Sequence, residues 1–464
     1  MFPESFIQRI NSQKYIDAEG LLKALEDPSP VSIRINRSKL DKNPLNSRTV
    51  PWCSSGFYLD SRPSYTLDPL FHSGCYYPQE ASGMFLEQIF NQVLNGEEYL
   101  RVLDLCAAPG GKSTHLSSLI GSRGLLIANE VIKNRASVLA ENIIKWGDSN
   151  TLVTRNDPSA FSELHGFFDV ILVDAPCSGE GMFRDSTAVE EWSVENALHC
   201  SGRQKRILND VWPSLKENGI LIYSTCTFNP GENEENIMWL ISEHQAENVF
   251  IAISDFKGVT EIEYQGIKGY GFYPGRIIGE GLFISVLRKT ANPGKKMARI
   301  PKKQSGEVTR ADIEIVKEWT GFPAESIIRE KDQIFSLHVP NEDYNILKKN
   351  LRIIKTGTRI CTVKKNVYVP NHELALSIGI RKDAFPSAEL GYSDAVRYLR
   401  RDNIIPFDIS KGWFIATYKG VNMGFCNNIG NRVNNYYPVD WRIRMSIPGK
   451  GERNIIYWNN KDLT

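Results

Sequence analysis

Short apolar segments alternate with segments of helical periodicity between Tyr99 and about Glu247, and this alternation constrains the fold more than any other feature of the chain. Helical spacing is clearest at Lys133–Trp146 and Gly202–Leu215. Strands that alternate with helices form a parallel sheet covered by helices on both faces. We therefore predict an α/β core whose strands lie at residues 100–105, 124–128, 151–154, 168–173 and 219–224.

The flanking segments have other patterns. Residues 31–36 alternate like a half-buried strand after a helical stretch, which predicts an N-terminal α+β domain. Hairpins are expected at 269–286, in the core, and at 413–425, in a β-rich C-terminal region. Residues 288–310 combine basic residues with Pro and Gly, as linkers do. The predicted units are residues 1–95, 96–290, a basic linker at 291–310, a small α+β domain at 311–390, and residues 391–464.

Charge is distributed unevenly along the chain, although the net charge is only +1. Residues 288–464 contain 31 Lys and Arg against 18 Asp and Glu, whereas residues 1–287 contain 24 against 36. An acidic catalytic part joined to a basic part that holds a polyanion has this distribution. The alternative is a solvated basic surface that has no partner.

The sequence indicates a cytoplasmic protein without a membrane anchor. No run approaches the roughly 18 apolar residues that span a bilayer, and the first residues do not resemble a signal peptide. None of the eight cysteines forms a CxxC pair, so we expect reduced thiols and no metal site. An ordinary cysteine is a small buried apolar residue. We also expect a monomer.

The first predicted strand ends in a loop of small residues, Asp104–Ser113, and a helix follows. Small residues let the backbone approach a ligand, and the helix N-terminus offers unpaired N–H groups. The loop lacks the glycine spacing of a phosphate-binding P-loop and of a dinucleotide site. Glu130 ends the second strand, where its carboxylate can accept both hydroxyls of a ribose, and Asp157 follows the third, where it can reach an adenine. Each acid taken alone is equally compatible with an exposed loop.

Two cysteines follow neighbouring strands, Cys177 after the fourth and Cys226 after the fifth. Both should face the cleft, unless they are two structural thiols placed there by chance. A thiolate that adds to carbon 6 of cytosine makes carbon 5 nucleophilic toward a sulfonium methyl group, and a thiolate also leaves readily. Asp174 is a candidate to stabilise the activated ring near N3, provided that it is protonated or donates through a partner.

These segments resemble the NOL/NOP/Sun family of RNA 5-methylcytosine methyltransferases. The resemblance rests on Leu103–Ser113, Asp174–Gly179 and Ser224–Thr227, with further matches at His72–Glu80 and Gly279–Phe283. It covers essentially residues 1–290. It implies a Rossmann-like class I methyltransferase core that uses S-adenosylmethionine.

The resemblance also implies roles for individual residues. Cys226 would be the nucleophile and Cys177 would help to release the product, with Asp174 and Lys112 beside them. Pro158 departs from the family pattern, which makes the adenine contact of the preceding acid less secure. The implied cofactor-binding residues are Cys106, Ala107, Ala108, Pro109, Gly110, Gly111, Lys112, Glu130, Arg135, Asp157 and Asp174.

The C-terminal segments Lys411–Gly424 and Asn434–Pro438 resemble a bacterial subgroup that ends in a PUA-like RNA-binding domain and acts on 16S ribosomal RNA near the decoding site. Cations beside aromatic residues suit folded RNA, although the aromatic residues are equally compatible with the core of a small β domain. The predicted RNA-binding residues are Arg397, Arg400, Arg401, Lys411, Lys419 and Arg432.

The leading hypothesis is therefore a 16S rRNA cytosine-5 methyltransferase whose partner is 16S rRNA or the 30S subunit. A tRNA cytosine-5 methyltransferase is the second hypothesis. A non-catalytic ribosome-assembly factor is the third, and it should have lost a thiol or the glycine loop, both of which this chain retains.

Overall fold

The computed structural model describes residues 2–40, 45–94, 96, 99–291, 308–402, 409–447, 449 and 453–458. Most of the basic linker predicted at 291–310 lies outside these residues. In the described part of the chain, no helix has the length and apolar character needed to cross a membrane.

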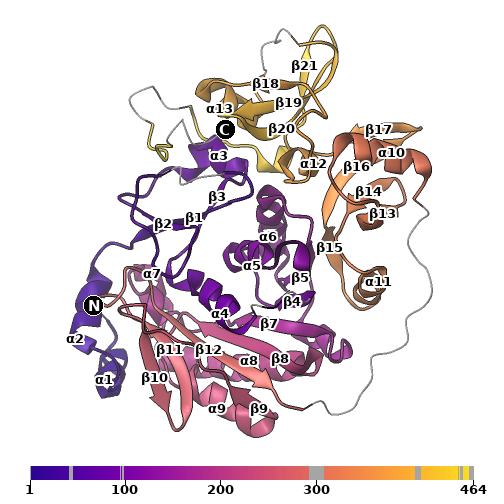
Figure 1. The fold of residues 1–464 in the computed structure, drawn as a ribbon. Coiled ribbons are helices and arrows are strands. Elements are labelled where there is room, and N and C mark those ends of the chain that lie inside the picture. Colours follow the sequence, from indigo (N-terminus) through magenta and orange to yellow (C-terminus); the bar gives the residue numbers. More distant parts are fainter. Residues whose placement is uncertain are drawn as a thin grey trace.

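A ten-stranded sheet forms the centre of the molecule (Figure 1). Its path is β10-β11-β12-β8-β7-β4-β5-β6-β15, and β9 pairs with β12. The five strands predicted for the parallel core run parallel to one another in the order β8-β7-β4-β5-β6, which confirms the expected Rossmann-like core. The strands are β4 (Leu100–Asp104), β5 (Gly124–Asn129), β6 (Thr151–Thr154), β7 (Phe168–Asp174), β8 (Leu215–Thr225), β9 (Ala246–Asn248), β10 (Thr260–Tyr264), β11 (Ile267–Phe272), β12 (Leu282–Lys289) and β15 (Ile353–Thr356).

Helices cover both faces of this sheet because successive strand residues point to opposite sides. Val102 of β4 packs in one cluster with Leu116 of α5, whereas Leu103 packs in another with Leu208 of α8. The helix predicted at 202–215 is wrong at both ends: the Ser193 side chain caps an earlier start, and the α-helix ends before Pro213. The helices are α4 (Leu86–Val93), α5 (Gly111–Ile120), α6 (Lys133–Trp146), α7 (Ser186–Glu191), α8 (Val194–Val211) and α9 (Glu234–Glu243).

The N-terminal part adds a small antiparallel sheet in the order β2-β1-β3. Phe6 and Ile10 of its first helix pack in the same core cluster as Leu103, so this part packs directly against the parallel sheet. Its elements are α1 (Glu4–Ser12), α2 (Ala18–Glu26), β1 (Val31–Ile35), β2 (Gly56–Leu59), α3 (Pro69–His72) and β3 (Tyr76–Pro78).

The C-terminal part contains two four-stranded sheets, β13-β14-β16-β17 and β18-β19-β20-β21. The second includes the predicted hairpin, and it lies over the N-terminal sheet (Figure 1), where Ile33 and Cys75 share a core with Tyr398 and Phe414. The elements of the C-terminal part are α10 (Arg310–Trp319), β13 (Ile327–Glu330), β14 (Gln333–Ser336), α11 (Asn341–Asn350), β16 (Thr358–Lys364), β17 (Val367–Pro370), α12 (His372–Leu376), β18 (Ser387–Glu389), α13 (Tyr392–Arg400), β19 (Gly412–Tyr418), β20 (Val421–Asn428) and β21 (Val433–Asn435).

Candidate functional site

A cavity of about 410 Å³ opens where β4, β7 and β8 end, which is the edge at which open parallel sheets bind ligands. The loop after β4, the N-terminal domain and the segment before β12 contribute to its wall. Pockets of a few hundred Å³ accept small molecules and single nucleobases. The lining residues are Tyr77, Pro78, Gln79, Glu80, Gly83, Cys106, Ala107, Ala108, Pro109, Gly111, Lys112, Asp174, Ala175, Met182, Cys226, Glu280, Gly281 and Leu282.

A cation and a carboxylate meet in this cavity. Lys112 Nζ lies 2.7 Å from Asp174 Oδ2, and the Ser224 hydroxyl donates to Asp174 Oδ1 at 2.7 Å. Burial lowers the pKa of Lys112, but the attraction of Asp174 outweighs this effect and the pKa is raised. Both carboxylate oxygens therefore accept hydrogen bonds, and Lys112 is the partner through which a proton can be donated.

The two cysteines predicted at the strand ends are in contact. Cys177 Sγ lies 3.0 Å from Cys226 Sγ, and the Cys226 backbone N–H donates to Cys177 Sγ at 3.2 Å. The hydrogen bond with Cys226 and burial raise the pKa of Cys177 well above its usual value. Cys177 therefore stays a thiol, whereas Cys226 lines the cavity. The site pairs a protonated thiol with a sulfur that faces the cavity.

A buried carboxylate that sequence reasoning missed joins the two cysteine loops. Glu232 accepts from the Ser178 N–H at 2.9 Å, the Ser178 hydroxyl at 2.5 Å and Gln204 Nε2 at 3.0 Å. Ser178 follows Cys177, and its hydroxyl lies 2.9 Å from the hydroxyl of Thr227, which follows Cys226. The run of Asn and Glu at 229–234 was visible in the sequence, but nothing in it indicated an inward-facing acid.

Glu180 supports the same region from the other side. It accepts from Arg9, from Trp192 Nε1 at 3.0 Å and from the Phe228 N–H at 3.1 Å, and its side chain is fully buried. The N-terminal helix therefore contacts the loop that carries the second cysteine.

Glu80 is a third acid that sequence reasoning quoted but assigned no role. It accepts from the Gly83 N–H at 3.1 Å and the Glu280 N–H at 2.7 Å, and burial raises its pKa. These bonds join the segments around 79–83 and 279–281, both of which were singled out by their resemblance to a family motif. Their spatial proximity could not be predicted, because 200 residues separate them.

The loop after β4 has the form expected of a ligand-binding turn. Gly110 has φ +117°, a left-handed conformation that favours glycine, and it is the residue before α5. The Ala107 N–H donates to Asn129 O, which joins the loop to the end of β5. Gly83 lines the same cavity as Ala107, Ala108 and Gly111, so small side chains form this part of its wall.

Glu130 and Arg135 form a linked pair beside the loop. Glu130 Oε1 accepts from the Ile132 N–H at 2.9 Å, its Oε2 lies 3.6 Å from Arg135 Nε, and Arg135 donates to Ala108 O at 2.9 Å. The predicted ribose-binding acid is therefore held next to the predicted cofactor loop.

Asp157 is held by contacts of its own at the end of β6 and is not among the residues that line the cavity. Its carboxylate caps the short helix that begins at Pro158 by accepting from the Ser159 N–H at 3.1 Å, and it forms a 3.9 Å ion pair with Arg206. Proline suits the first position of a helix, which explains the departure from the family pattern. The adenine contact of Asp157 remains a prediction.

The polar groups beside the loop after β4 fit S-adenosylmethionine. Asp104 is buried, its Oδ2 accepts from Ser113 at 2.6 Å, and among the described residues its Oδ1 has no hydrogen-bond partner. Burial raises the pKa of Asp104 to about 7. A buried acceptor of this kind requires a donor, and an ammonium group is one. Glu130 offers a second carboxylate, and the N-terminus of α5 favours an anion.

The predicted RNA-binding residues lie in the C-terminal part. Arg397 and Arg400 form ion pairs with Asp394 and Asp402, at 3.4 and 2.8 Å. Arg401 donates to Tyr437 O. The Lys411 stem lies against Gly430, and the Lys419 N–H donates to Glu389. Their contact with RNA remains a prediction.

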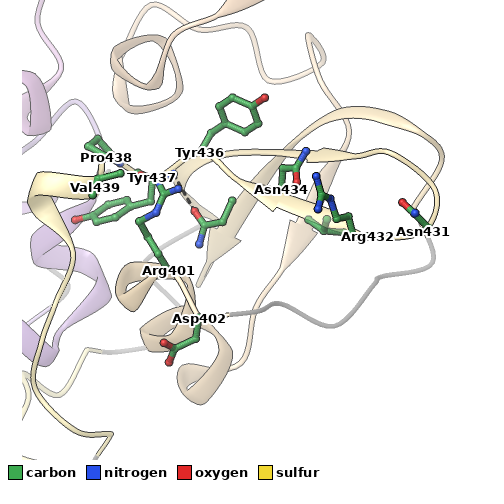
Figure 2. A pocket seen from close by; sticks show the side chains of 11 residues that line it. Arg401, Asp402, Asn431, Arg432, Asn434, Tyr436, Tyr437, Pro438 and Val439 are labelled. Carbon is green, nitrogen blue, oxygen red and sulfur yellow. Dashed lines mark hydrogen bonds between the residues drawn. The ribbon is translucent and has the colours of Figure 1, made fainter.

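Arg401 and Arg432 line one groove of about 890 Å³. Figure 2 shows Arg432 with Asn431 and Asn434 at one side of it, and Arg401 with Tyr437 at the other. Tyr436 is exposed beside this groove, whereas Tyr437 and Tyr418 are buried in the core. Two of these three tyrosines therefore belong to the packed core, and Tyr436 is the one exposed to solvent.

Three family models match the chain. The model of the 16S rRNA methyltransferase RsmB/F covers residues 91–288, the model of the N-terminal domain of 16S rRNA methyltransferase RsmF covers 2–81, and the RsmF PUA domain covers 385–443. The C-terminal sheet that contains β19 and β20 therefore belongs to a PUA domain.

Curated relatives match over nearly the whole length. The chain is 30% identical to ribosomal RNA small subunit methyltransferase F of Klebsiella pneumoniae (strain 342), over 94% of this chain and 96% of that protein. It is also 30% identical to the protein of the same name from Vibrio parahaemolyticus, with the same coverage.

Solved structures match the core. A methyltransferase homolog protein from Pyrococcus horikoshii is 30% identical, with a TM-score of 0.53 over 62% of this chain and 95% of that one. NSun6 from the same organism, crystallised with SFG, is 22% identical, with a TM-score of 0.51 over 63% of this chain and 99% of that one, and it shows the shared fold.

Proposed function

Because this chain belongs to the RsmF-type 16S rRNA methyltransferase family, we propose that it methylates carbon 5 of a cytosine in 16S rRNA through a covalent adduct of Cys226. The observation that carries the proposal is Cys226, which lines the same cavity as the Lys112–Asp174 pair and whose sulfur lies 3.0 Å from that of Cys177. We place the target near the decoding site, as the resemblance implies.

S-adenosylmethionine supplies a methyl group on a positively charged sulfur. The residues suited to hold it are Asp104 for its ammonium group, Glu130 for its ribose, and the loop at residues 106–111 for its amino-acid portion. The acidic side chains also favour a cationic ligand over its neutral product. Asp157 and Arg135 complete the proposed set at the adenosine side.

The thiolate form of Cys226 begins the reaction by forming a bond from Sγ to carbon 6 of the cytosine. The π electrons of the carbon 5–carbon 6 bond shift toward carbon 4, and negative charge develops on N3 and the carbonyl oxygen. Lys112, held by Asp174 at 2.7 Å, is the donor placed in this cavity to stabilise that charge. Asp174 thus acts through Lys112 rather than as a free acid.

Carbon 5 then takes the methyl group, and the methyl–sulfur bond breaks. A base accepts the carbon 5 proton, the carbon 5–carbon 6 double bond re-forms, and the bond to Cys226 Sγ breaks with its electrons returning to sulfur. We assign Cys177 to this release step, because its sulfur is in contact with the sulfur that leaves.

The cytosine must leave its stack to reach Cys226. The arginines of the PUA domain, Arg397, Arg400, Arg401 and Arg432, with Lys411 and Lys419, are proposed to contact the phosphates of the RNA around it.

The proposal is tested by transfer of labelled methyl groups to 30S subunits, bare 16S RNA and tRNA, with bisulfite mapping of the product. We expect one or a few modified cytosines in 16S RNA, and no transfer by Cys226→Ala. The matched control is Cys200→Ala, which removes a buried thiol outside the cavity. Transfer mainly to tRNA would reassign the substrate. Cofactor binding without transfer to any acceptor would favour a non-catalytic assembly factor.

A further inference from the structure

A buried cluster of three potential metal ligands lies outside the proposed active site. Cys53, Glu87 and His115 are contributed by the loop before β2, by α4 and by α5, and each offers one ligand atom within 4.8 Å of those of the other two. All three residues are at most 8% exposed. The described part of the chain holds one such cluster.

The contacts within this cluster are too long for good hydrogen bonds. Cys53 Sγ lies 3.9 Å from His115 Nε2, and His115 Nε2 lies 3.5 Å from Glu87 Oε2. Within the described residues, His115 Nδ1 has no hydrogen-bond partner at all. Buried imidazoles normally form short hydrogen bonds, whereas the contacts of this ring at Nε2 are long.

The same distances suit the edges of a coordination tetrahedron. Zinc–sulfur and zinc–nitrogen bonds of about 2.3 and 2.0 Å give a sulfur–nitrogen edge of about 3.6 Å and a nitrogen–oxygen edge of about 3.3 Å. The two observed separations exceed these edges by a few tenths of an ångström, and Cys53 Sγ lies within 4.8 Å of the Glu87 carboxylate, so the three groups must draw together to bind an ion. The Ser55 hydroxyl lies 3.6 Å from Cys53 Sγ, beside the cluster.

Zinc takes the thiolate of Cys53, the carboxylate of Glu87 and the neutral ring of His115, so binding of the ion releases the proton of the Cys53 thiol.

We propose that one zinc ion is bound by Cys53, Glu87 and His115, and that this structural ion links the N-terminal domain to the methyltransferase core. A thiolate and a carboxylate together neutralise the two charges of the ion, as a buried site requires. The inference does not depend on the proposed reaction, and it differs from the expectation of no metal that followed from the absence of CxxC pairs. The three ligands come from segments that are distant in the sequence, so no short motif of the CxxC kind marks them.

Elemental analysis of the untagged protein, purified without chelators, tests the proposal. We expect about one zinc per chain, and its loss from Cys53→Ser, Glu87→Gln and His115→Gln, whereas Cys200→Ser keeps it. Protein without zinc that also takes up no Co²⁺ during dialysis, or full zinc retention by the cluster variants, would overturn the proposal.

A second readout serves if the variants do not fold. Wild-type protein loaded with Co²⁺ should show the near-ultraviolet absorption of a thiolate bound to Co²⁺. A chelator should remove the ion and lower the thermal midpoint, and added zinc should restore it. An unchanged midpoint, or a Co²⁺ spectrum without the thiolate band, would contradict the assignment.

Discussion

Glu232 should position both cysteines without touching the substrate, and its replacement by alanine tests this role. Its carboxylate accepts the Ser178 N–H and Gln204 amide at Oε2 and the Ser178 hydroxyl at Oε1. Each hydrogen bond to a charged group contributes about 1.5–3 kcal/mol to the unfolding free energy. Removal of the carboxylate also removes the cost of burying its charge, which offsets part of this loss. We expect Glu232→Ala to lower the unfolding free energy by about 3 kcal/mol.

The catalytic effect should exceed the effect on cofactor binding. Displacement of the Cys177 and Cys226 loops by about 1 Å is expected to lower kcat about 10–100-fold. Cofactor affinity should stay near the wild-type value, since Glu232 contacts the cysteine loops. Single-turnover methyl transfer and calorimetric titration of the cofactor measure the two quantities. Glu235→Gln, in the same segment but exposed, is the matched control.

Glu232→Gln separates hydrogen-bond geometry from charge. The glutamine oxygen can accept the Ser178 N–H and the Gln204 amide. Its NH₂ group can donate to the Ser178 hydroxyl, which in turn donates to Thr227. This variant should therefore recover most of the lost activity. Wild-type kcat in the alanine variant, or equal losses in both variants, would refute the positioning role.

Three further predictions concern other parts of the chain. Lys112→Met removes the cation from Asp174 and should lower kcat about 10²–10³-fold in single-turnover assays, with RNA binding unchanged. Burial raises the pKa of Asp104 from 3.8 to about 7, so the stability this group contributes is present below pH 3.8 and is lost as the pH rises through 7. Asp104→Asn should lack that loss in unfolding curves recorded from pH 5 to 9; an equal decline in both proteins would count against it. Arg432→Ala should weaken binding to every RNA and reduce the slope of log affinity against log salt by about one, and an unaltered slope would exclude a phosphate contact.

The parallel core was predictable because its pattern is local. Strands β4, β5, β6 and β7 lie within a residue of the predicted bounds, since each is a buried apolar run that ends in small or polar residues. The strand ends also placed Cys177, Cys226, Asp174 and Glu130 at one edge of the sheet, because parallel strands end on the same side.

Contacts between distant segments were not predictable in this way. β15, from the region after the linker, pairs with β6 and extends the sheet, and no periodicity indicates the partner of a short strand. Glu180 and Glu232 are fully buried acids whose donors come from other segments, Arg9 among them. Charged residues are usually exposed, so composition alone predicts the opposite location.

The most direct test of the covalent mechanism uses 16S RNA in which 5-fluorocytosine replaces cytosine. Fluorine at carbon 5 prevents the final loss of a proton, so the adduct should persist with S-adenosylmethionine present. Denaturing electrophoresis followed by mass spectrometry identifies the attached peptide. We predict a stable protein–RNA complex joined through Cys226. Attachment through Cys177, or no complex under conditions in which ordinary 16S RNA is methylated, would contradict the assignment of Cys226 as nucleophile.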